Sequence, residues 1–231
     1  PIDGASLVED GTSGAMSVAS VAPPGDLWSP APAVYIDKLV VVRTVADSFG
    51  PDAIDAPTGW VLATVARAKN KDVQDVVVFI VDRPRHKQLI HDVRQAGARV
   101  FVRTGGDVGG ALLAADAASP VDIMLGIGGV AEGLITACAV KALGGAMLGR
   151  VAPQSQDERQ ACLDGGIDMD RILSCGDMVT GDEVYFAATG ITDGLLLHGV
   201  RYHGDFVDTQ SMVLRFETGT RRIITTEHRV K

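Results

Sequence analysis

The sequence predicts an α/β protein built around a sheet that helices cover on both faces. Three segments in a row each pair a short apolar strand with a helical pattern, as the units of a parallel sheet do. The 231 residues are 46% hydrophobic and 22% charged, which excludes a mainly disordered chain and allows a sizeable core. The 27 glycines fall between apolar runs with no collagen-like period, so we expect many tight turns.

The middle of the chain carries the clearest patterns. Residues 76–81 form a continuous apolar run, which is typical of a strand buried on both faces. Pro84 opens the following helix, because proline suits the first helical turn, and Gly97 ends it. The same alternation continues with strands expected at 99–102, 121–125 and 146–151 and helices expected at 107–118, 130–143 and 156–163.

The two ends differ from this middle part. Residues 16–22 and 35–42 are strand candidates, and Thr58 caps a helical pattern that runs to about Lys69. The tail is rich in short apolar runs with glycine turns between several of them, so we expect antiparallel pairing there. The expected strands of the tail are 184–188, 196–202, 211–215 and 220–228.

Composition excludes several classes of function. The chain has 21 Lys and Arg against 29 Asp and Glu, a net charge of −8, which argues against general nucleic-acid binding. No apolar run approaches the ~18 residues of a membrane span. Cys138, Cys162 and Cys175 lie too far apart for a disulfide framework or a zinc pattern, so we expect inert thiols in a reducing cytoplasm. Because the sequence begins at Pro1 without an initiator Met, we expect a fragment of a longer protein.

Three loops should meet at one edge of the predicted sheet. Ligands bind beyond the carboxyl ends of the strands in such sheets. The loops 83–86, 104–107 and 126–133 each follow a predicted strand and precede a helix. One crevice could therefore receive two arginines, several helix N-termini and two carboxylates.

Arg83 and Arg85 flank Pro84, and residues two apart in an extended segment share a face. Both guanidinium groups could clamp one phosphate together with the free N–H groups of the next helix. The alternative is a solvated pair of charges at a helix start.

The glycine-rich loop at 126–133 has two interpretations. Its G-x-G-x-x-A pattern, ending at Ala131, is similar to a dinucleotide fingerprint, but no acidic residue lies between Val140 and Gln156 to bind a ribose. The other interpretation centres on Glu132, in the first turn of a helix. This carboxylate either serves the helix dipole alone or also holds a divalent metal at the crevice.

Other candidates are weaker taken singly. The turn Pro1-Ile2-Asp3-Gly4 carries a carboxylate, and Tyr35 and Lys38 could line a pocket. The five histidines show no zinc-binding spacing, and no G-x-S-x-G elbow is present.

Taken in order, several short segments resemble one family, the class II fructose-1,6-bisphosphatases of the metal-dependent, lithium-sensitive phosphatase superfamily. The resemblance covers essentially the whole chain. The segments are Pro1-Ile2-Asp3-Gly4, Tyr35-x-x-Lys38-Leu39, Arg83-Pro84-Arg85-His86, Gly106-Asp107-Val108, Gly126-Ile127-Gly128-Gly129-x-x-Glu132-Gly133, Gly176-Asp177-Met178 and Ala188-Thr189-Gly190-Ile191-Thr192-Asp193-Gly194.

The resemblance implies an activity and a site. It implies Mn²⁺- or Mg²⁺-dependent hydrolysis of the 1-phosphate of fructose 1,6-bisphosphate in gluconeogenesis, with sedoheptulose 1,7-bisphosphate as a further substrate of some members. Asp3 and Glu132 correspond to metal ligands, and Arg83 and Arg85 would anchor the phosphate that stays. The positions that correspond to substrate contacts are Asp3, Gly4, Tyr35, Arg83, Pro84, Arg85, Gly106, Asp107 and Gly129.

The chain departs from the family pattern in ways that affect catalysis. The family's catalytic threonine falls at Ala5, which has no hydroxyl, and we expect Ser6 to point elsewhere because adjacent side chains diverge. The Asp that precedes this proline in the family, and the family's further upstream ligands, lie outside the sequence that starts at Pro1, and the family's Asp-Gly-Asp begins here with Gly105. Ala131 replaces a stiffening proline. A catalytically impaired homologue that still binds sugar bisphosphates is therefore the second hypothesis, and a dinucleotide-dependent enzyme the third.

The resemblance also implies a layered α/β/α/β/α fold with a mostly parallel sheet and part of an antiparallel one. We divide the chain into the remainder of a metal and phosphate subdomain (1–70), a parallel α/β subdomain (71–183) and a β-rich C-terminal segment (184–231). We expect a cytoplasmic homo-oligomer that acts on a small sugar bisphosphate and binds neither nucleic acid nor membrane.

Overall fold

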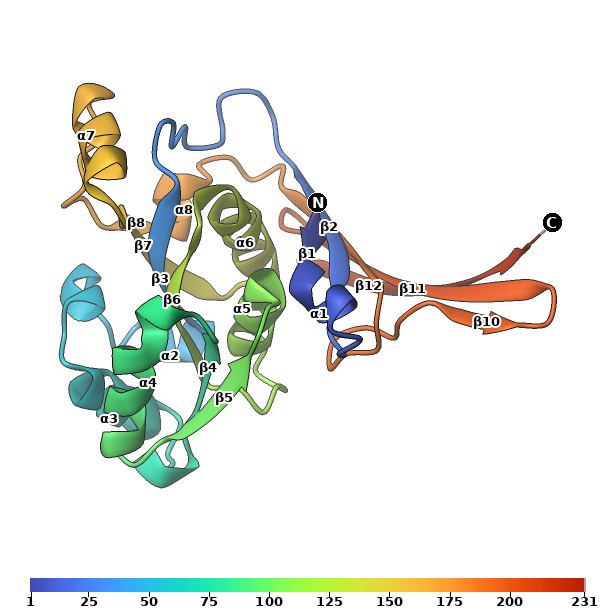
Figure 1. Ribbon diagram of the computed structural model, residues 1–231, viewed down its shortest axis with the longest axis horizontal. Helices are drawn as coiled ribbons and strands as arrows, with labels where there is room; N and C mark the ends of the chain where they lie inside the picture. The colour runs from blue at the N-terminus through green and yellow to red at the C-terminus, as the bar shows by residue number, and fades with distance from the viewer. Residues whose placement is uncertain (231) are drawn as a thin grey trace.

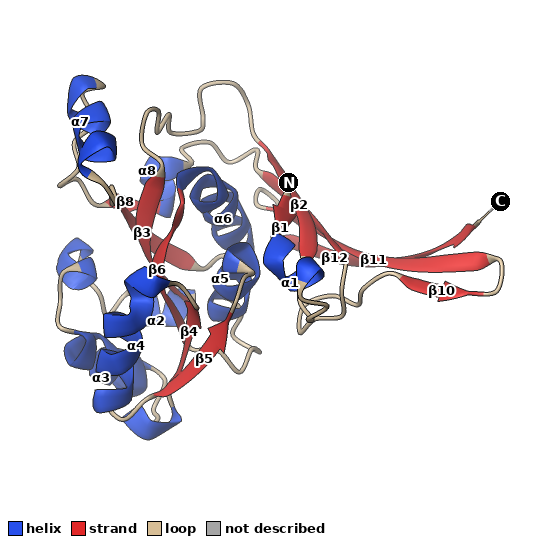
Figure 2. Cartoon of the chain, in the orientation of Figure 1, coloured by secondary structure: helices blue, strands red, loops and turns tan. Residues whose placement is uncertain are grey.

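The computed structural model describes residues 1–230 and confirms the α/β class, with two sheets and helices packed against them (Figures 1 and 2). No helix among these residues is both long and apolar enough to cross a membrane. The helices are α1 (Ala5–Glu9), α2 (Arg43–Ala46), α3 (Thr58–Ala68), α4 (Lys87–Gln95), α5 (Asp107–Ala115), α6 (Val130–Leu143), α7 (Gln156–Asp164) and α8 (Cys175–Met178), with 3-10 turns at Pro51–Ile54, Val73–Asp75 and Pro84–His86. The strands are β1 (Ile2–Asp3), β2 (Met16–Val21), β3 (Tyr35–Val41), β4 (Val77–Val81), β5 (Arg99–Arg103), β6 (Ile123–Gly129), β7 (Ala146–Val151), β8 (Leu173–Ser174), β9 (Tyr185–Gly190), β10 (Arg201–His203), β11 (Phe206–Arg215) and β12 (Thr220–Arg229).

The first sheet is mixed, in the order β5-β4-β6-β3-β7-β8. β4 pairs in parallel with β5 and β6, as the repeated strand–helix pattern predicts. β3 lies between β6 and β7 and runs antiparallel to both, and β8 is antiparallel to β7. The parallel part is therefore confined to β5-β4-β6. β3 enters the sheet from a long preceding loop, and a local apolar pattern does not specify which strand it will pair with.

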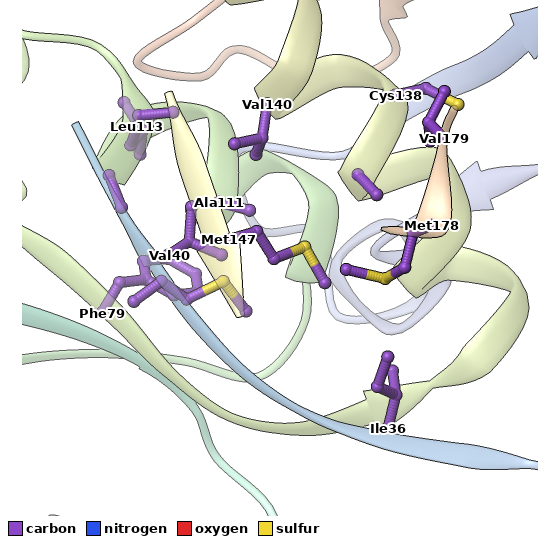
Figure 3. Close-up of a cluster of buried hydrophobic side chains, with 14 of the residues drawn as sticks. Ile36, Val40, Phe79, Ala111, Leu113, Cys138, Val140, Met147, Met178 and Val179 are labelled. Carbon is purple, nitrogen blue, oxygen red and sulfur yellow. The ribbon is translucent and has the colours of Figure 1, made fainter. Parts of the chain in front are cut away.

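Two pairs of helices cover this sheet on opposite faces. α3 and α4 pack on one face around Leu62 and Val93, while α5 and α6 pack on the other, where Figure 3 shows part of the core. The second sheet packs on the far side of α5 and α6, with Phe186 and Met212 in its buried face. Residues 1–230 thus form the layers α/β/α/β of the expected α/β/α/β/α arrangement. On the outer face of the second sheet, Val21 is 65% exposed.

The second sheet joins the two ends of the chain. Its order is β1-β2-β9-β11-β10, with β12 paired to β11, and all of its pairings are antiparallel. β10, β11 and β12 project from the body as an arm (Figure 1). The expected strand at 196–202 is wrong except at its end, where β10 begins. Gly199 packs so closely on the backbone of Thr192 that a Cβ would lie 2.6 Å from its carbonyl carbon, so this segment folds back as a loop. The three-part division into subdomains stays a prediction.

A buried carboxylate fixes the start of the parallel part. Asp122 is fully buried, and its carboxylate accepts hydrogen bonds from Lys71 Nζ (2.7 Å) and from the N–H of Val77 (2.9 Å), while Lys69 Nζ lies 2.5 Å away. Burial raises the pKa of Asp122, but the bonds from the two lysines and Val77 outweigh it and hold the pKa below its usual value. The ion pairs therefore tie the loop before β4 to the start of β6.

We expect Asp122→Ala to lower the free energy of unfolding by about 2–3 kcal/mol, because the variant loses charge-assisted hydrogen bonds at a buried site. Urea unfolding measures the change. Asp55→Ala, which removes an exposed ion pair with Arg150, serves as the control and should cost less than about 1 kcal/mol. Equal losses in the two variants would contradict this account of the buried carboxylate.

Candidate functional site

The turn after β1, the loops that follow β4 and β5, and the junction of β6 with α6 line one cavity of about 280 Å³. It lies at the carboxyl ends of the parallel strands, as the sequence predicts for a ligand site. The cavity is lined by Ile2, Asp3, Gly4, Ala5, Ser6, Val81, Arg83, Arg85, Gly105, Gly106, Asp107, Ile127, Gly128, Gly129 and Glu132.

Asp3 joins the turn after β1 to the start of α5. The N–H of Val108 donates to its Oδ1 (3.2 Å) and the N–H of Gly109 to its Oδ2 (2.8 Å). These donors are free N–H groups of the first helical turn, where a negative charge is favourable. Asp3 is only 4% exposed, and burial raises its pKa to about 6 despite these bonds, with Asp107 adding to the rise. The carboxylate is thus preformed and held at the cavity wall.

Two glycines let the loops after β1 and β5 come into contact. Gly4 (φ +80°) and Gly106 (φ +85°) both adopt the left-handed conformation that precedes α1 and α5. A Cβ on the neighbouring Gly105 would lie 3.1 Å from the Gly4 Cα and 2.9 Å from the Ser6 Oγ. Because these glycines carry no side chains, the two loops approach closely and place Asp3 and Asp107 at the same cavity.

Asp107 is paired with a buried lysine. Lys38 comes from β3, its side chain is fully buried, and its Nζ bonds to Asp107 Oδ2. Gly128 of β6 leaves room for this pair, because a Cβ there would lie 2.7 Å from the lysine nitrogen. Lys38 neutralises one of the acidic groups of the site and holds α5 against the first sheet.

The Arg85 guanidinium is anchored on the backbone of β6. Its Nε and Nη2 donate to the Ile127 carbonyl at 3.0 and 2.8 Å, and its Cζ lies 5.1 Å from the centre of the Tyr35 ring. The Ile127 N–H in turn donates to His86 Nε2 (2.8 Å), while His86 Nδ1–H donates to the Val81 carbonyl (2.6 Å). His86 therefore connects the end of β4 to Ile127, the residue whose carbonyl holds Arg85. Burial lowers the pKa of this imidazole, which suits its neutral form.

Arg83 reaches the loop after β5. Its Nη1 donates to the carbonyls of Asp82 (3.0 Å) and Thr104 (2.8 Å). The Ser6 hydroxyl donates to the same Thr104 carbonyl (3.1 Å). Ser6 lines the cavity beside Ala5, but its hydroxyl is directed to the loop after β5, in line with the expectation that it points elsewhere.

The carboxylates of the cavity are of the ligand type that binds a divalent cation. Asp3 and Glu132 line the cavity with carboxylate oxygens, the ligands that Mg²⁺ and Mn²⁺ prefer, and Mg²⁺ is commonly held by one or two carboxylates with water and substrate phosphate. Glu132 is exposed at the start of α6 and folds back over Gly129. Within residues 1–230, no group of three or more close ligand side chains forms at this cavity.

The structure brings most of the predicted site residues together. All of them line the cavity except Tyr35, which lines an adjoining space with Arg83, Arg85 and Glu132, and Pro84, which lines neither. The dinucleotide interpretation of the glycine segment finds no support, because residues 126–129 are the end of β6 and form no loop before α6. The role of His86, which supports Ile127 through the Ile127 N–H, was not identified from the sequence. Its place directly after a buried strand was the available signal.

Comparison with known proteins agrees with this geometry. The family model for bacterial fructose-1,6-bisphosphatase, glpX-encoded, matches residues 1–228. A D-fructose 1,6-bisphosphatase class 2/sedoheptulose 1,7-bisphosphatase from Synechococcus sp. (strain JA-2-3B'a(2-13)) is 34% identical over 241 residues, which cover 99% of this chain and 68% of the relative. The protein of the same description from Trichodesmium erythraeum (strain IMS101) is also 34% identical, with 69% of its length covered. The chain therefore belongs to the bacterial class II fructose-1,6-bisphosphatases, a family of phosphatase hydrolases.

Proposed function

We propose that the chain binds fructose 1,6-bisphosphate in this cavity and hydrolyses its 1-phosphate to give fructose 6-phosphate, as a step of gluconeogenesis. The observation that carries the proposal is the meeting of Arg83 and Arg85 with Asp3 and Glu132 around one space. Cations suit one phosphate of the substrate, and carboxylates suit a metal at the other. The names of the relatives support sedoheptulose 1,7-bisphosphate as a second substrate.

The two arginines are suited to the phosphate that is not cleaved. Each guanidinium has five N–H donors, and the backbone carbonyls of Thr104 and Ile127 occupy only part of this set. Anchored at these carbonyls, the groups lose little freedom when a phosphate binds, and Arg pairs well with phosphate oxygens. The Arg85 guanidinium also lies over the Tyr35 ring, so an aromatic ring stands beside the group proposed to bind the phosphate.

Asp3 and Glu132 would hold the divalent cation that the family implies, Mn²⁺ or Mg²⁺. Such a cation, when bound, polarises the phosphoryl group and supplies an activated water. The chain itself contributes the fixed Asp3 carboxylate and the N-terminus of α5, whose dipole favours negative charge. Ala5 offers no hydroxyl to orient a water, so the chain lacks general acid–base assistance at this position.

A catalytically impaired sugar-bisphosphate-binding homologue is the second candidate function. Ala5 favours it, because it lines the cavity without a hydroxyl, and the neighbouring Ser6 hydroxyl already donates to the Thr104 carbonyl. Binding of the substrate without any metal-dependent release of phosphate would support this alternative.

We also infer that the protein acts in the cytoplasm as a homo-oligomer. The net charge of −8 and the small polar cavity favour a small anionic ligand held by local cations rather than nucleic acid. No strand among residues 1–230 pairs with the outer edge of β12, which is exposed along nearly its whole length, and such an edge favours association of copies.

Introducing a hydroxyl at position 5 tests whether Ala5 limits the rate of phosphate release. We expect Ala5→Thr to raise the kcat for phosphate release from fructose 1,6-bisphosphate with Mn²⁺ or Mg²⁺ by a factor in the ~10²–10⁴ range of general acid–base assistance. Ala5→Val has the same branching without the hydroxyl and should give no gain. The proposed hydrolysis fails if neither the native chain nor Ala5→Thr releases phosphate.

Removing the Arg85 guanidinium should weaken substrate binding and leave the chemical step largely intact. We expect Arg85→Gln to raise the KM for fructose 1,6-bisphosphate by about 10–100-fold, because charge-assisted hydrogen bonds contribute ~1.5–3 kcal/mol. Steady-state kinetics measure this, and calorimetric titration replaces them if turnover is too slow. Arg94→Gln, an exposed site on α4, is the matched control. An unchanged KM for Arg85→Gln would contradict the phosphate clamp.

His86 should make stability sensitive to acid. Its folded pKa lies below its usual value of 6.5, so the unfolded chain binds more protons below pH 6.5 and stability falls as the pH falls through this range. The neighbours Arg85 and Lys38 favour the neutral form and Asp107 the charged form. We expect the free energy of unfolding of the native protein to fall with a slope of up to ~1.4 kcal/mol per pH unit relative to His86→Gln. Urea unfolding between pH 5 and 8 measures it. His91→Gln, which is exposed, should retain the native slope.

A further inference from the structure

The projecting arm carries three metal-binding side chains on one face, one from each of its strands. His203 comes from β10, Asp208 from β11 and Glu227 from β12. Each offers a ligand atom, and these atoms all lie within 4.8 Å of one another. His203 Nε2 is 3.1 Å from Asp208 Oδ1. Within residues 1–230 this is the one group of three or more such side chains so close together.

The register of the arm explains why these side chains meet. Asp208 and Glu227 are direct partners across β11 and β12, so their side chains leave the same face at neighbouring positions. His203 is the partner of Phe206, two residues before Asp208, and therefore shares that face. The cluster is thus fixed by backbone hydrogen bonding and does not depend on a flexible loop.

This arrangement leaves two negative charges facing each other. Like charges directly opposite on neighbouring strands destabilise a sheet. His203 is the one basic side chain within ion-pair distance of Asp208 in the described chain, and Glu227 has none within that distance among residues 1–230. Arg201, opposite Asp208 on β10, and Arg229, two residues after Glu227, share this face, but neither forms an ion pair with the two carboxylates among residues 1–230, and Arg201 pairs with Asp193 instead. A divalent cation between the two carboxylates would remove the repulsion.

We propose that His203, Asp208 and Glu227 bind a divalent transition metal such as Zn²⁺. Imidazole nitrogen together with carboxylate oxygen is a donor set of zinc, with bonds of ~2.0–2.2 Å. A tetrahedral site with such bonds separates its ligand atoms by about 3.3–3.6 Å, close to the 3.1 Å between His203 Nε2 and Asp208 Oδ1. Glu227 is exposed and can close the remaining gap by a change of rotamer, with water as the fourth ligand.

This site is separate from the phosphatase cavity, because no residue of the arm lines that cavity. A metal held by β10, β11 and β12 together would cross-link three strands that have little core of their own, since β10 is fully exposed and β12 nearly so. Metals commonly supply the stability that a small exposed element lacks. The site would therefore act as a structural pin for the arm.

Titration with Zn²⁺ tests the proposal on the full chain. Isothermal calorimetry should count one more site in the native protein than in His203→Ala, or should show an affinity lower by at least the ~10–100-fold that loss of even a supporting partner costs. His228→Ala is the matched control, because His228 follows Glu227 on β12 and faces the opposite side, beside Thr209. It should bind as the native protein does. Counting sites by difference separates the arm from metal bound at Asp3 and Glu132.

Nuclear magnetic resonance of the imidazole rings gives a second readout. Zn²⁺ should shift the ring signals of His203 and leave those of His228 in place, and Glu227→Gln, which keeps the size of the side chain, should weaken the shift. The proposal is overturned if His203→Ala and the native protein titrate alike. It is also overturned if the His203 ring responds to pH but not to Zn²⁺, because the cluster would then be only an ion pair with Asp208.

Discussion

The site depends on one buried carboxylate that bridges the two halves of the molecule. Asp3 belongs to the second sheet. Its carboxylate accepts hydrogen bonds from the N–H groups of Val108 and Gly109, which belong to the helix layer between the sheets. This contact holds the turn after β1 against the loop after β5. Without this contact, the turn that carries Asp3 would not be held at the cavity that Glu132 and the two arginines line.

The charged groups of the site are held in place by an ion pair and by backbone carbonyl oxygens. Buried Lys38 neutralises Asp107 at the cavity wall, in room that Gly128 leaves open. Arg83 and Arg85 are held on carbonyl oxygens rather than on carboxylates, so their positive charge remains available to a ligand. In the proposed function, a dianionic phosphate would find in one cavity both arginine cations and the carboxylates of Asp3 and Glu132, which suit a metal.

Much of this could be predicted from the sequence, for identifiable physical reasons. The apolar runs and helix signals located β4, α6 and β7, because periodicity and caps are local properties. Arg83 and Glu132 were predicted to lie near one another, because ligands bind at the carboxyl ends of parallel strands. The insertion of β3 between β6 and β7 could not be predicted, because partner choice is a long-range property. The part of His86 was hidden for the same reason, since it depends on the Ile127 N–H 41 residues away.

We infer that this cavity binds a sugar bisphosphate and that the protein removes one of its phosphates. Phosphorus NMR of fructose 1,6-bisphosphate incubated with the chain and Mg²⁺ tests this inference, because the two phosphates give separate signals. We expect the 1-phosphate signal to decline as inorganic phosphate appears, while the 6-phosphate signal persists. Two phosphate signals that neither shift on addition of the protein nor decline with time would contradict both binding and hydrolysis.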